Sequence, residues 1–541
     1  MPTSLPWLVL LGPLTLAGAG ALLVIRGRGA VRDPARLGGF LAATMLALAV
    51  AAAIVVARHG PQRTGLVGGD GIGFSVWLDA LSVTMLLLVS FIGLIVVRYS
   101  RHYLAGDPGQ PRFVGLLCLA LAAVLLLIVA GNLLQFTLAW IATSLALHWL
   151  LLFYPDRPAA RIAARKKFIA SRLGDCCLFG AMLLLYRAFG TLDYAELVHA
   201  AQALRAPGGD AGAASLAACL LAGAALLKSA QFPLHGWLPE VMETPTPVSA
   251  LLHAGIINAG GFLVLRFAGL MSASGPAMEL LVIVGGFTAL FGSVVMLTQS
   301  SVKVALAYST IAQMGFMLLQ CGLGAFSAAA LHIVAHSLYK AHAFLSSGSV
   351  IDLQRAAWTP SPGGRPHAAR MLLALVAVVA SAVAVGALFG VTVEERPGHL
   401  ALGTIVTLGL VQLVASSIDE RPSSFVIGIT IARAAGVAVA WFSLQWVAER
   451  LLADALPPLP APAGPFELSV IGLVVLSFAA LALFQGMLPH RAAEWHALYV
   501  LVANGLYVNT FVTRLMLRLW PSLADDARAS PAFNANQGVR T

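Results

Sequence analysis

The sequence predicts an all-α polytopic membrane protein with about 14 to 15 transmembrane helices. Its 541 residues are 59% hydrophobic and only 10% charged, whereas about a quarter of the residues are charged in soluble globular domains. A helix needs about 20 apolar residues to cross the hydrocarbon core. About fifteen such stretches begin near residues 6, 37, 76, 113, 132, 168, 213, 247, 278, 302, 324, 371, 399, 424 and 467. Little chain remains for a soluble catalytic domain, so we do not expect an enzyme.

The basic residues predict the orientation of these helices. The formal net charge is +10, and Lys and Arg of membrane proteins collect in cytoplasmic loops. About 16 of them fall in alternate short loops, against about 6 in the other loops. These basic loops are 26–36, 98–112, 154–167, 352–370 and 417–423. We therefore expect a periplasmic N-terminus, lipid around the helices, and no nucleic-acid partner.

The cysteines do not indicate a cofactor. All five lie in apolar stretches and none forms a C-x-x-C pair, so neither an iron–sulfur cluster nor a disulfide framework is predicted. We expect no bound cofactor and no metal in this chain.

Lysine is rare, with five residues against 28 arginines. Three of the five, Lys228, Lys303 and Lys340, fall inside or at the mouth of predicted spans. A buried lysine can release its proton whereas arginine cannot, and cations at membrane depth usually mark ion or proton paths. Pro233 follows Lys228 and is expected to break its helix beside a cavity. Lys303 lies near a helix start, so its side chain could instead extend to the interface.

A polar row is predicted in the span 324–350. His332, His336 and Lys340 are four residues apart and therefore share one helix face. Imidazole titrates near neutral pH, so such a row can pass protons along a helix. The alternatives are hydrogen bonding between helices and metal binding, but a third metal ligand is missing nearby in the sequence.

Two further groups of ionisable residues lie at or beside membrane depth. Arg172 and Asp175 are three residues apart in an apolar helix and are expected to form a pair. Asp79 stands at the start of a span, where it could bind a lysine or only cap the helix.

Glu240 and Glu243 lie in a short amphipathic segment between two spans, and Glu243 is a candidate carboxylate for tuning Lys228. His253 lies in the span 247–268. A single histidine in a membrane helix can be a proton relay or a structural hydrogen-bonding group.

Several long motifs resemble the antiporter-like, proton-translocating subunits of respiratory complex I (subunit 5-like) and of Mrp antiporters. The motifs are Leu-Lys-Ser-Ala-Gln-Phe-Pro-Leu-His-Gly-Trp-Leu-Pro-Glu (227–240), the run 242–254, Lys-Val-Ala-Leu-Ala-Tyr-Ser-Thr-Ile-Ala-Gln-Met-Gly (303–315) and Arg-Leu-Gly-Asp (172–175). The resemblance covers about residues 70–352 and implies two inverted helical repeats with broken helices. It implies that Lys228 is the lysine of the first channel, that Lys303 and His253 connect the channels, and that His332, His336 and Lys340 form the central relay.

The breaker-rich loops 354–370 and 453–466 and the composition of the C-terminal part, together with this resemblance, predict an organisation in five parts. They are N-terminal helices over 1–112, a first repeat over 113–270, a second, degenerate repeat over 271–423, C-terminal helices over 424–490, and an amphipathic helix with a disordered tail over 491–541.

The sequence departs from the family at two positions. The family usually has a glutamate after the tryptophan of the fifth span, but Ile141 follows Trp140. The segment 371–392, where the second repeat usually has a lysine, contains none. The usual exit half-channel is therefore incomplete.

The branch that fits best is the DabB-type membrane subunits of the DAB inorganic-carbon accumulation systems, which the run 336–349 and the poorly charged C-terminal third resemble. That resemblance implies the bacterial inner membrane and a peripheral DabA-like zinc protein, similar to a β-carbonic anhydrase, as partner. The zinc is expected in that partner, and the coupling ion is H⁺ or Na⁺. The alternatives are a pumping subunit of an NADH-quinone oxidoreductase, an Mrp-type cation/proton antiporter, or a passive membrane anchor.

Overall fold

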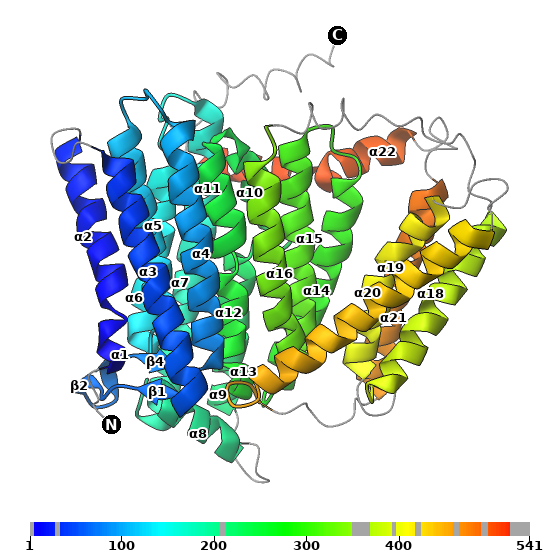
Figure 1. Ribbon diagram of the computed structural model, residues 1–541, viewed down its shortest axis with the longest axis horizontal. Coiled ribbons are helices and arrows are strands. Elements are labelled where there is room, and N and C mark those ends of the chain that lie inside the picture. Colours follow the sequence, from blue (N-terminus) through cyan, green and yellow to red (C-terminus); the bar gives the residue numbers. More distant parts are fainter. Residues whose placement is uncertain are drawn as a thin grey trace.

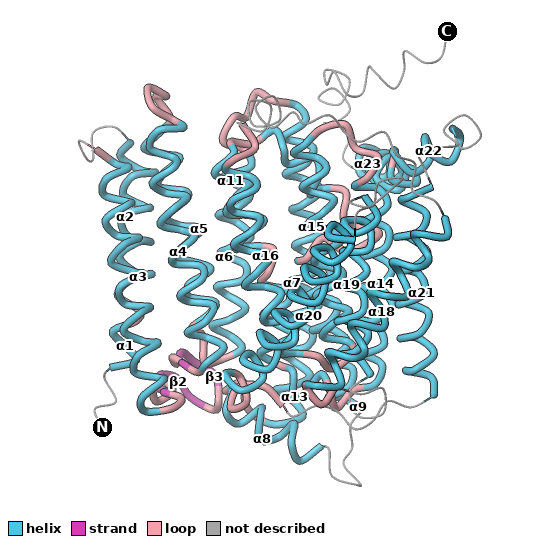
Figure 2. Tube along the Cα trace, turned by 45° about the vertical axis from the view of Figure 1, so that its right-hand side comes forward, coloured by secondary structure: helices cyan, strands magenta, loops and turns pink. Residues whose placement is uncertain are grey.

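The fold is a bundle in which most helices run roughly parallel to one another, while those of the C-terminal part are tilted or lie across one end (Figures 1 and 2). This computed structural model describes residues 5–27, 33–204, 212–348, 368–391, 397–416, 424–457, 465–487 and 496–519. The strands within these ranges form two short antiparallel pairs near the end of the bundle where the N-terminus lies. They are β1 (Gln62–Arg63) with β4 (Trp77–Leu78), and β2 (Val67–Gly69) with β3 (Ile72–Phe74).

The helices follow the chain in three groups. The first is α1 (Leu5–Leu8), α2 (Leu11–Arg26), α3 (Pro34–His59), α4 (Ala80–Tyr103), α5 (Gln110–Ile128), α6 (Leu133–Leu151), α7 (Pro158–Phe189) and α8 (Tyr194–Leu204). The second is α9 (Gly212–Lys228), α10 (Trp237–Glu240), η2 (Val241–Glu243), α11 (Thr246–Leu251), η3 (Leu252–Ile256), α12 (Ala259–Arg266), α13 (Ala268–Met271), α14 (Gly275–Met296), α15 (Val302–Gly322) and α16 (Phe326–Leu345). The third is α18 (Ala368–Leu388), α19 (Pro397–Ser416), α20 (Ser424–Leu451), α21 (Pro465–Met487), α22 (His496–Ala503), η5 (Gly505–Tyr507) and α23 (Val508–Leu519).

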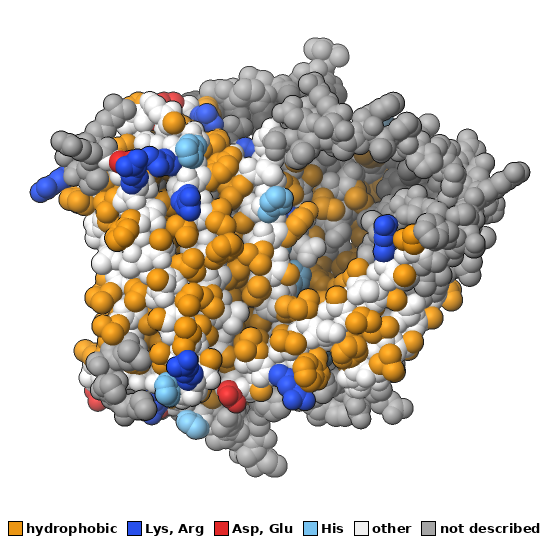
Figure 3. Space-filling view, viewed as in Figure 1, with side chains coloured by type: hydrophobic (Ala, Val, Ile, Leu, Met, Phe, Trp, Pro, Cys, Tyr) orange, Lys and Arg blue, Asp and Glu red, His pale blue; other side chains and the backbone are white. Residues whose placement is uncertain are grey.

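The expectation of an all-α polytopic membrane protein is confirmed. Among the described residues, nine helices are long and apolar enough to cross a membrane. Other long or apolar helices, α9, α16 and α18 to α21, lie alongside them in the same bundle. Figure 3 shows the expected surface, with apolar side chains over the middle of the visible face and Lys and Arg mostly toward its two ends.

One predicted helix boundary is wrong. The span expected to start near 168 begins ten residues earlier, because α7 starts at Pro158. Proline suits the first turn of a helix, and the following alanines Ala160, Ala163 and Ala164 are buried. Part of the predicted loop 154–167 is therefore helix, and it carries two lysines into the bundle.

Two breaks interrupt the helices of the central block. The prediction that Pro233 ends the helix of Lys228 is confirmed, since α9 stops at Lys228 and α10 begins only at Trp237. The span 247–268 is also irregular, because the π-helical turn η3 separates α11 from α12. Single π-turns of this kind occur often at functional sites.

The C-terminal helices pack on the central block through small and apolar side chains. Leu402, Ile405 and Val474 join a buried cluster with residues of α14, α15 and α16. Within the central block, a Cβ atom on Gly315 would stand 2.6 Å from the backbone nitrogen of Ala289, so α14 and α15 can approach closely only with glycine there. The segment 371–392 falls mostly in α18, which is continuous.

The last described helices lie across one end of the bundle (Figures 1 and 2). The α22 helix and the η5–α23 segment are bent by 59° relative to each other. Gln299 donates a hydrogen bond to the carbonyl oxygen of Ala503 at 3.1 Å. This position resembles the interfacial helix predicted for 491–541, and the tail after residue 519 is outside the described residues.

Candidate ion path

The first candidate lysine lies at the helix break. Lys228 is the last residue of α9 and is 8% exposed. Its Nζ lies 4.4 Å from the ring centroid of Trp140 and 3.4 Å from the carbonyl oxygen of Trp140. A cation over an indole face is stabilised where water is scarce. Trp140 therefore contacts the Lys228 ammonium with both its ring and its carbonyl oxygen.

A second lysine, not predicted as a site residue, belongs to the same cluster. Lys167 of α7 is buried, and its Nζ donates to the carbonyl oxygen and the hydroxyl of Ser144 at 2.5 and 2.9 Å. The expected pair is confirmed, with Arg172 Nη2 2.7 Å from Asp175 Oδ2. Arg172 and Asp175 both act electrostatically on Lys228. The three cations Lys167, Arg172 and Lys228 therefore surround one carboxylate, that of Asp175.

The sequence contained a signal for Lys167. Lys167, Ser171 and Asp175 follow at intervals of four residues and therefore share one face of α7. The adjacent Lys166 lies about 100° away around the same helix. Because Lys166 and Lys167 fall in the predicted basic loop 154–167, the row Lys167, Ser171 and Asp175 was not predicted.

The central row also forms as predicted. His332, His336 and Lys340 all lie on α16, with the rings of His332 and His336 6.0 Å apart. Lys340 is fully buried, and its Nζ donates to the carbonyl oxygen of Leu306 at 3.1 Å. His332 Nδ1 is 3.0 Å from Gln320 Oε1. The row therefore faces α15, and the groups within hydrogen-bonding distance are neutral.

His253 joins this row through a hydroxyl. The Thr310 hydroxyl donates to the same Leu306 carbonyl oxygen at 3.1 Å, so it accepts a hydrogen bond from His253 Nδ1 at 2.9 Å. A proton on Nδ1 leaves Nε2 as the basic nitrogen. Among the described residues, neither His253 Nε2 nor His336 Nε2 has a hydrogen-bond partner, although both are buried. Two imidazoles near Lys340 can therefore accept a proton.

Lys303 and the two glutamates lie at the end of the bundle near α10. Lys303 donates to the hydroxyl of Thr246 at 3.2 Å. Glu240 forms an ion pair with Lys166 at 2.6 Å, and Asn509 of α23 hydrogen-bonds to both of them, at 2.8 and 2.9 Å. Glu240 is thus engaged away from Lys228. The side chain of Glu243 is outside the described residues.

Asp79 lies apart from the lysines. It caps α4 by accepting from the backbone nitrogen of Ser82 at 2.7 Å, and it pairs with Arg266 at 2.6 Å. Burial alone would raise the pKa of Asp79, but the Arg266 charge and these hydrogen bonds hold that pKa below its ordinary value. The partner of Asp79 is therefore an arginine and not a lysine. Because Arg266 belongs to α12, this ion pair connects the start of α4 to α12.

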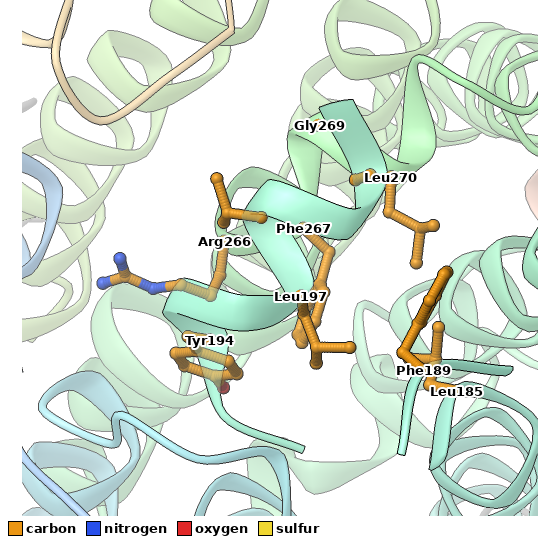
Figure 4. Close-up of a pocket in the computed structure, with 10 residues that line it drawn as sticks. Leu185, Phe189, Tyr194, Leu197, Arg266, Phe267, Gly269 and Leu270 are labelled. Carbon is orange, nitrogen blue, oxygen red and sulfur yellow. The ribbon is translucent and has the colours of Figure 1, made fainter. Parts of the chain in front are cut away.

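A small cavity lies beside this pair. It measures about 20 Å³, which is room for about one water molecule. Figure 4 shows the Arg266 guanidinium turned away from Leu197, Phe267 and Leu270 in its wall. Its size excludes it as a substrate pocket. Within the described part of the chain, no three His, Cys, Asp or Glu side chains are grouped to ligate a metal ion.

Comparison with known proteins identifies the family. The family described as "NADH:quinone oxidoreductase/Mrp antiporter, TM" matches residues 130–359, and "NADH-Ubiquinone oxidoreductase (complex I), chain 5 N-terminus" matches residues 67–114. The chain is 41% identical over 497 residues to the probable inorganic carbon transporter subunit DabB2 of Halothiobacillus neapolitanus, covering 89% of this chain and 87% of the relative. The chain belongs to the DabB family of inorganic carbon transporter subunits. A second DabB, from Hydrogenovibrio crunogenus, is 36% identical over 84% of this chain and 85% of its own.

The wider similarity places the DabB family among the antiporter-like subunits. The NADH-quinone oxidoreductase subunit L of Escherichia coli is 40% identical, but the match covers only 53% of this chain and 46% of that subunit. In a solved structure of the Mrp complex from Dietzia sp., one chain aligns with a TM-score of 0.62 and 25% identity, covering 98% of this chain and 60% of that one. The predicted resemblance to both groups is confirmed.

Proposed function

We propose that this DabB-family chain conducts protons and is the membrane subunit of an inorganic carbon accumulation complex. In this proposal, proton flow drives one-way hydration of CO₂ to bicarbonate by a DabA-like peripheral zinc protein. The names of the relatives with the longest matches support the carbon substrate. Two buried lysine clusters at membrane depth support ion conduction. No catalytic residue is assigned to this chain.

The Lys228 cluster is suited to proton exchange. Lys167, Arg172 and Lys228 carry up to three positive charges, and Asp175 supplies one negative charge. Burial penalises such excess charge. Arginine does not release its proton, so one of the two lysines does. Lys228 stands at the helix break, where freed backbone groups favour water, and we assign the exchange to it.

The α16 row provides the next acceptors. Lys340 and His253 share the Leu306 carbonyl oxygen through Thr310, and the open nitrogens of His253 and His336 lie close to the Lys340 charge. A proton can therefore move between amine and imidazole without a buried carboxylate. Lys303 stands at the mouth of this region beside Thr246.

The membrane potential can supply enough free energy to couple proton flow to CO₂ hydration. A proton that moves down about 100 mV releases about 2.3 kcal/mol, which corresponds to more than about tenfold in an equilibrium ratio. We place the zinc partner at the cytoplasmic ends of the helices and the N-terminus in the periplasm of the inner membrane, because the sequence predicts that the basic loops lie on the opposite side from the N-terminus.

The buried Lys228 over Trp140 is the observation that carries the proposal, and a conservative substitution tests it. Lys228→Arg keeps the charge but removes a group that can release a proton. We expect growth on air levels of CO₂ to fail with Lys228→Arg and with Lys228→Ala, at normal abundance of the chain. Arg187→Gln, an exposed change on the same bundle, is the matched control and should grow. Normal growth of Lys228→Ala would contradict the assignment.

An Mrp-type cation/proton antiporter is the second candidate, favoured by the structural match over nearly the whole chain. Gentle extraction of the tagged chain separates the two. A stoichiometric zinc-containing soluble partner supports carbon accumulation. Sodium/proton exchange by the chain with other membrane subunits and no zinc protein supports the antiporter.

A further inference from the structure

The C-terminal helices contain a polar cluster that the path described above does not use. His399 Nε2 of α19 lies 3.3 Å from Glu449 Oε1 in the last turn of α20. Gln445, one turn earlier, donates to Glu449 Oε1 at 3.2 Å. The other ionisable residues of α18 to α21 are Arg370, Arg433, Arg450 and Glu467. His399 lies in the first turn of α19, and a buried imidazole paired with a carboxylate at the end of such apolar helices is a candidate for a functional site.

This cluster contacts the helix of the central row. Gln445 also donates to the hydroxyl of Ser327 on α16 at 2.8 Å. Ser327 lies in the first turn of α16, five residues before His332, which is about 7.5 Å along the helix axis. The row Lys340, His336, His332 therefore approaches the level of Ser327 along the axis, although Ser327 lies about 140° around α16 from His332. The last turn of α20, which carries Glu449, lies at the end of the bundle where α16 begins and where α13 is found (Figure 1).

The two side chains of the ion pair differ in how exposed they are. The His399 side chain is 3% exposed, whereas that of Glu449 is 23% exposed. The row and the cluster each include a buried amide with an open group, since neither Gln320 Nε2 beside His332 nor Gln445 Oε1 beside Glu449 has a partner among the described residues. Amides of this kind bind bridging water. A proton that enters at the more exposed Glu449 carboxylate could thus reach His332 through such water.

We propose that Glu449, paired with His399, is the terminal proton-exchange group of the α16 row, in place of the lysine that 371–392 lacks. This inference rests on the proposed proton conduction. It extends the proposed path from His332 to the side of the membrane where the N-terminus lies. One proton moves from bulk water on the N-terminal side to the Glu449 carboxylate and then through bridging water to the His332 imidazole. Each transfer breaks one bond to hydrogen and forms another, without electron transfer. His399 stabilises the Glu449 carboxylate and positions it.

Proton flux into proteoliposomes that hold the complete complex tests this inference. Glu449→Gln keeps the shape and a hydrogen-bonding oxygen but cannot titrate at neutral pH, so flux should fall by at least about tenfold. Glu449→Asp should retain part of the flux with a shifted pH–flux curve, and His399→Gln should shift that curve as well. Glu279→Gln removes an exposed carboxylate on α14 and should leave flux unchanged.

The outcomes separate this inference from the proposed function. Wild-type flux together with full flux in Glu449→Gln overturns the role of Glu449 and leaves proton conduction intact. An absence of flux in the wild type overturns both. Where Glu449→Gln does not assemble, Glu449→Asp decides, since an unchanged pH–flux curve would overturn the inference and a shifted one would support it.

Discussion

The two buried lysines of the candidate path lie in different electrostatic surroundings. Lys228 is grouped with two other cations and the carboxylate of Asp175, and it stands over the Trp140 ring. Lys340 donates to a backbone carbonyl, and among the described residues it has no acidic ion-pair partner. Its titratable neighbours are His253 and His336.

This difference indicates two ways of keeping an amine in a membrane. At Lys228, the amine lies among other fixed charges, two positive and one negative, so the site depends on every member of the cluster. At Lys340, dipoles and neutral imidazoles replace fixed charges, so its site should tolerate changes at Asp175. The predictions that follow test this contrast, from the largest expected effect to the smallest.

Replacing either lysine by arginine should have the largest effect. Lys340→Arg and Lys228→Arg both keep a charge that cannot be released, and each should lower proton flux by at least about tenfold in proteoliposomes. Equal abundance of the two variants in the membrane is the control. Retained flux in Lys340→Arg alone would remove Lys340 from the path.

Asp175→Asn should distinguish the two sites. The loss of the carboxylate leaves the buried Lys167 and Lys228 and the partly exposed Arg172 without their anion. The cost should be below the about 3–5 kcal/mol that is typical of breaking a fully buried pair, because Arg172 is partly exposed. We expect less folded protein and reduced flux. A second substitution at Lys167, to methionine, should recover part of both, because it removes one of the excess charges. The absence of any recovery in thermal stability would contradict the shared-cluster account.

Asp79→Asn should lower stability without a specific effect on flux per folded molecule. Arg266 would lose its buried partner, which again costs about 3–5 kcal/mol. The pKa of Asp79 is below its ordinary value, so the pair stabilises the fold above that ordinary value and the stabilisation is lost as the pH falls through the lowered pKa. Unfolding measured from pH 7 downward should show this loss in the wild type and not in Asp79→Asn.

Asn509→Ala should have the smallest effect. It removes two hydrogen bonds that connect α23 to Glu240 and Lys166, each worth about 0.5–1.5 kcal/mol. The Glu240–Lys166 pair remains, so we expect a melting temperature lower by a few degrees and nearly normal flux. A complete loss of flux would show that α23 takes part in conduction.

The relations that lie within one helix were predictable from the sequence. Arg172 with Asp175, and the row His332, His336 and Lys340, follow directly from helical spacing. The end of α9 at Lys228 followed from Pro233. The general architecture followed from composition.

Relations between helices were not predictable in the same way. The contact of Lys167 with Ser144 and the shared Leu306 carbonyl depend on how α6 packs on α7 and how α15 packs on α16. Glu240 could be placed near the break from its position in the sequence, but its partner Asn509 lies 269 residues away. A single sequence carries no distance between such segments.

The most direct test of the account is proton flux through the purified complete complex in proteoliposomes under an imposed pH gradient, with wild type, Lys228→Arg and Arg187→Gln compared at equal protein content. The account predicts flux in wild type and Arg187→Gln and at least about tenfold less in Lys228→Arg. Equal flux in all three proteins would contradict conduction through the buried Lys228.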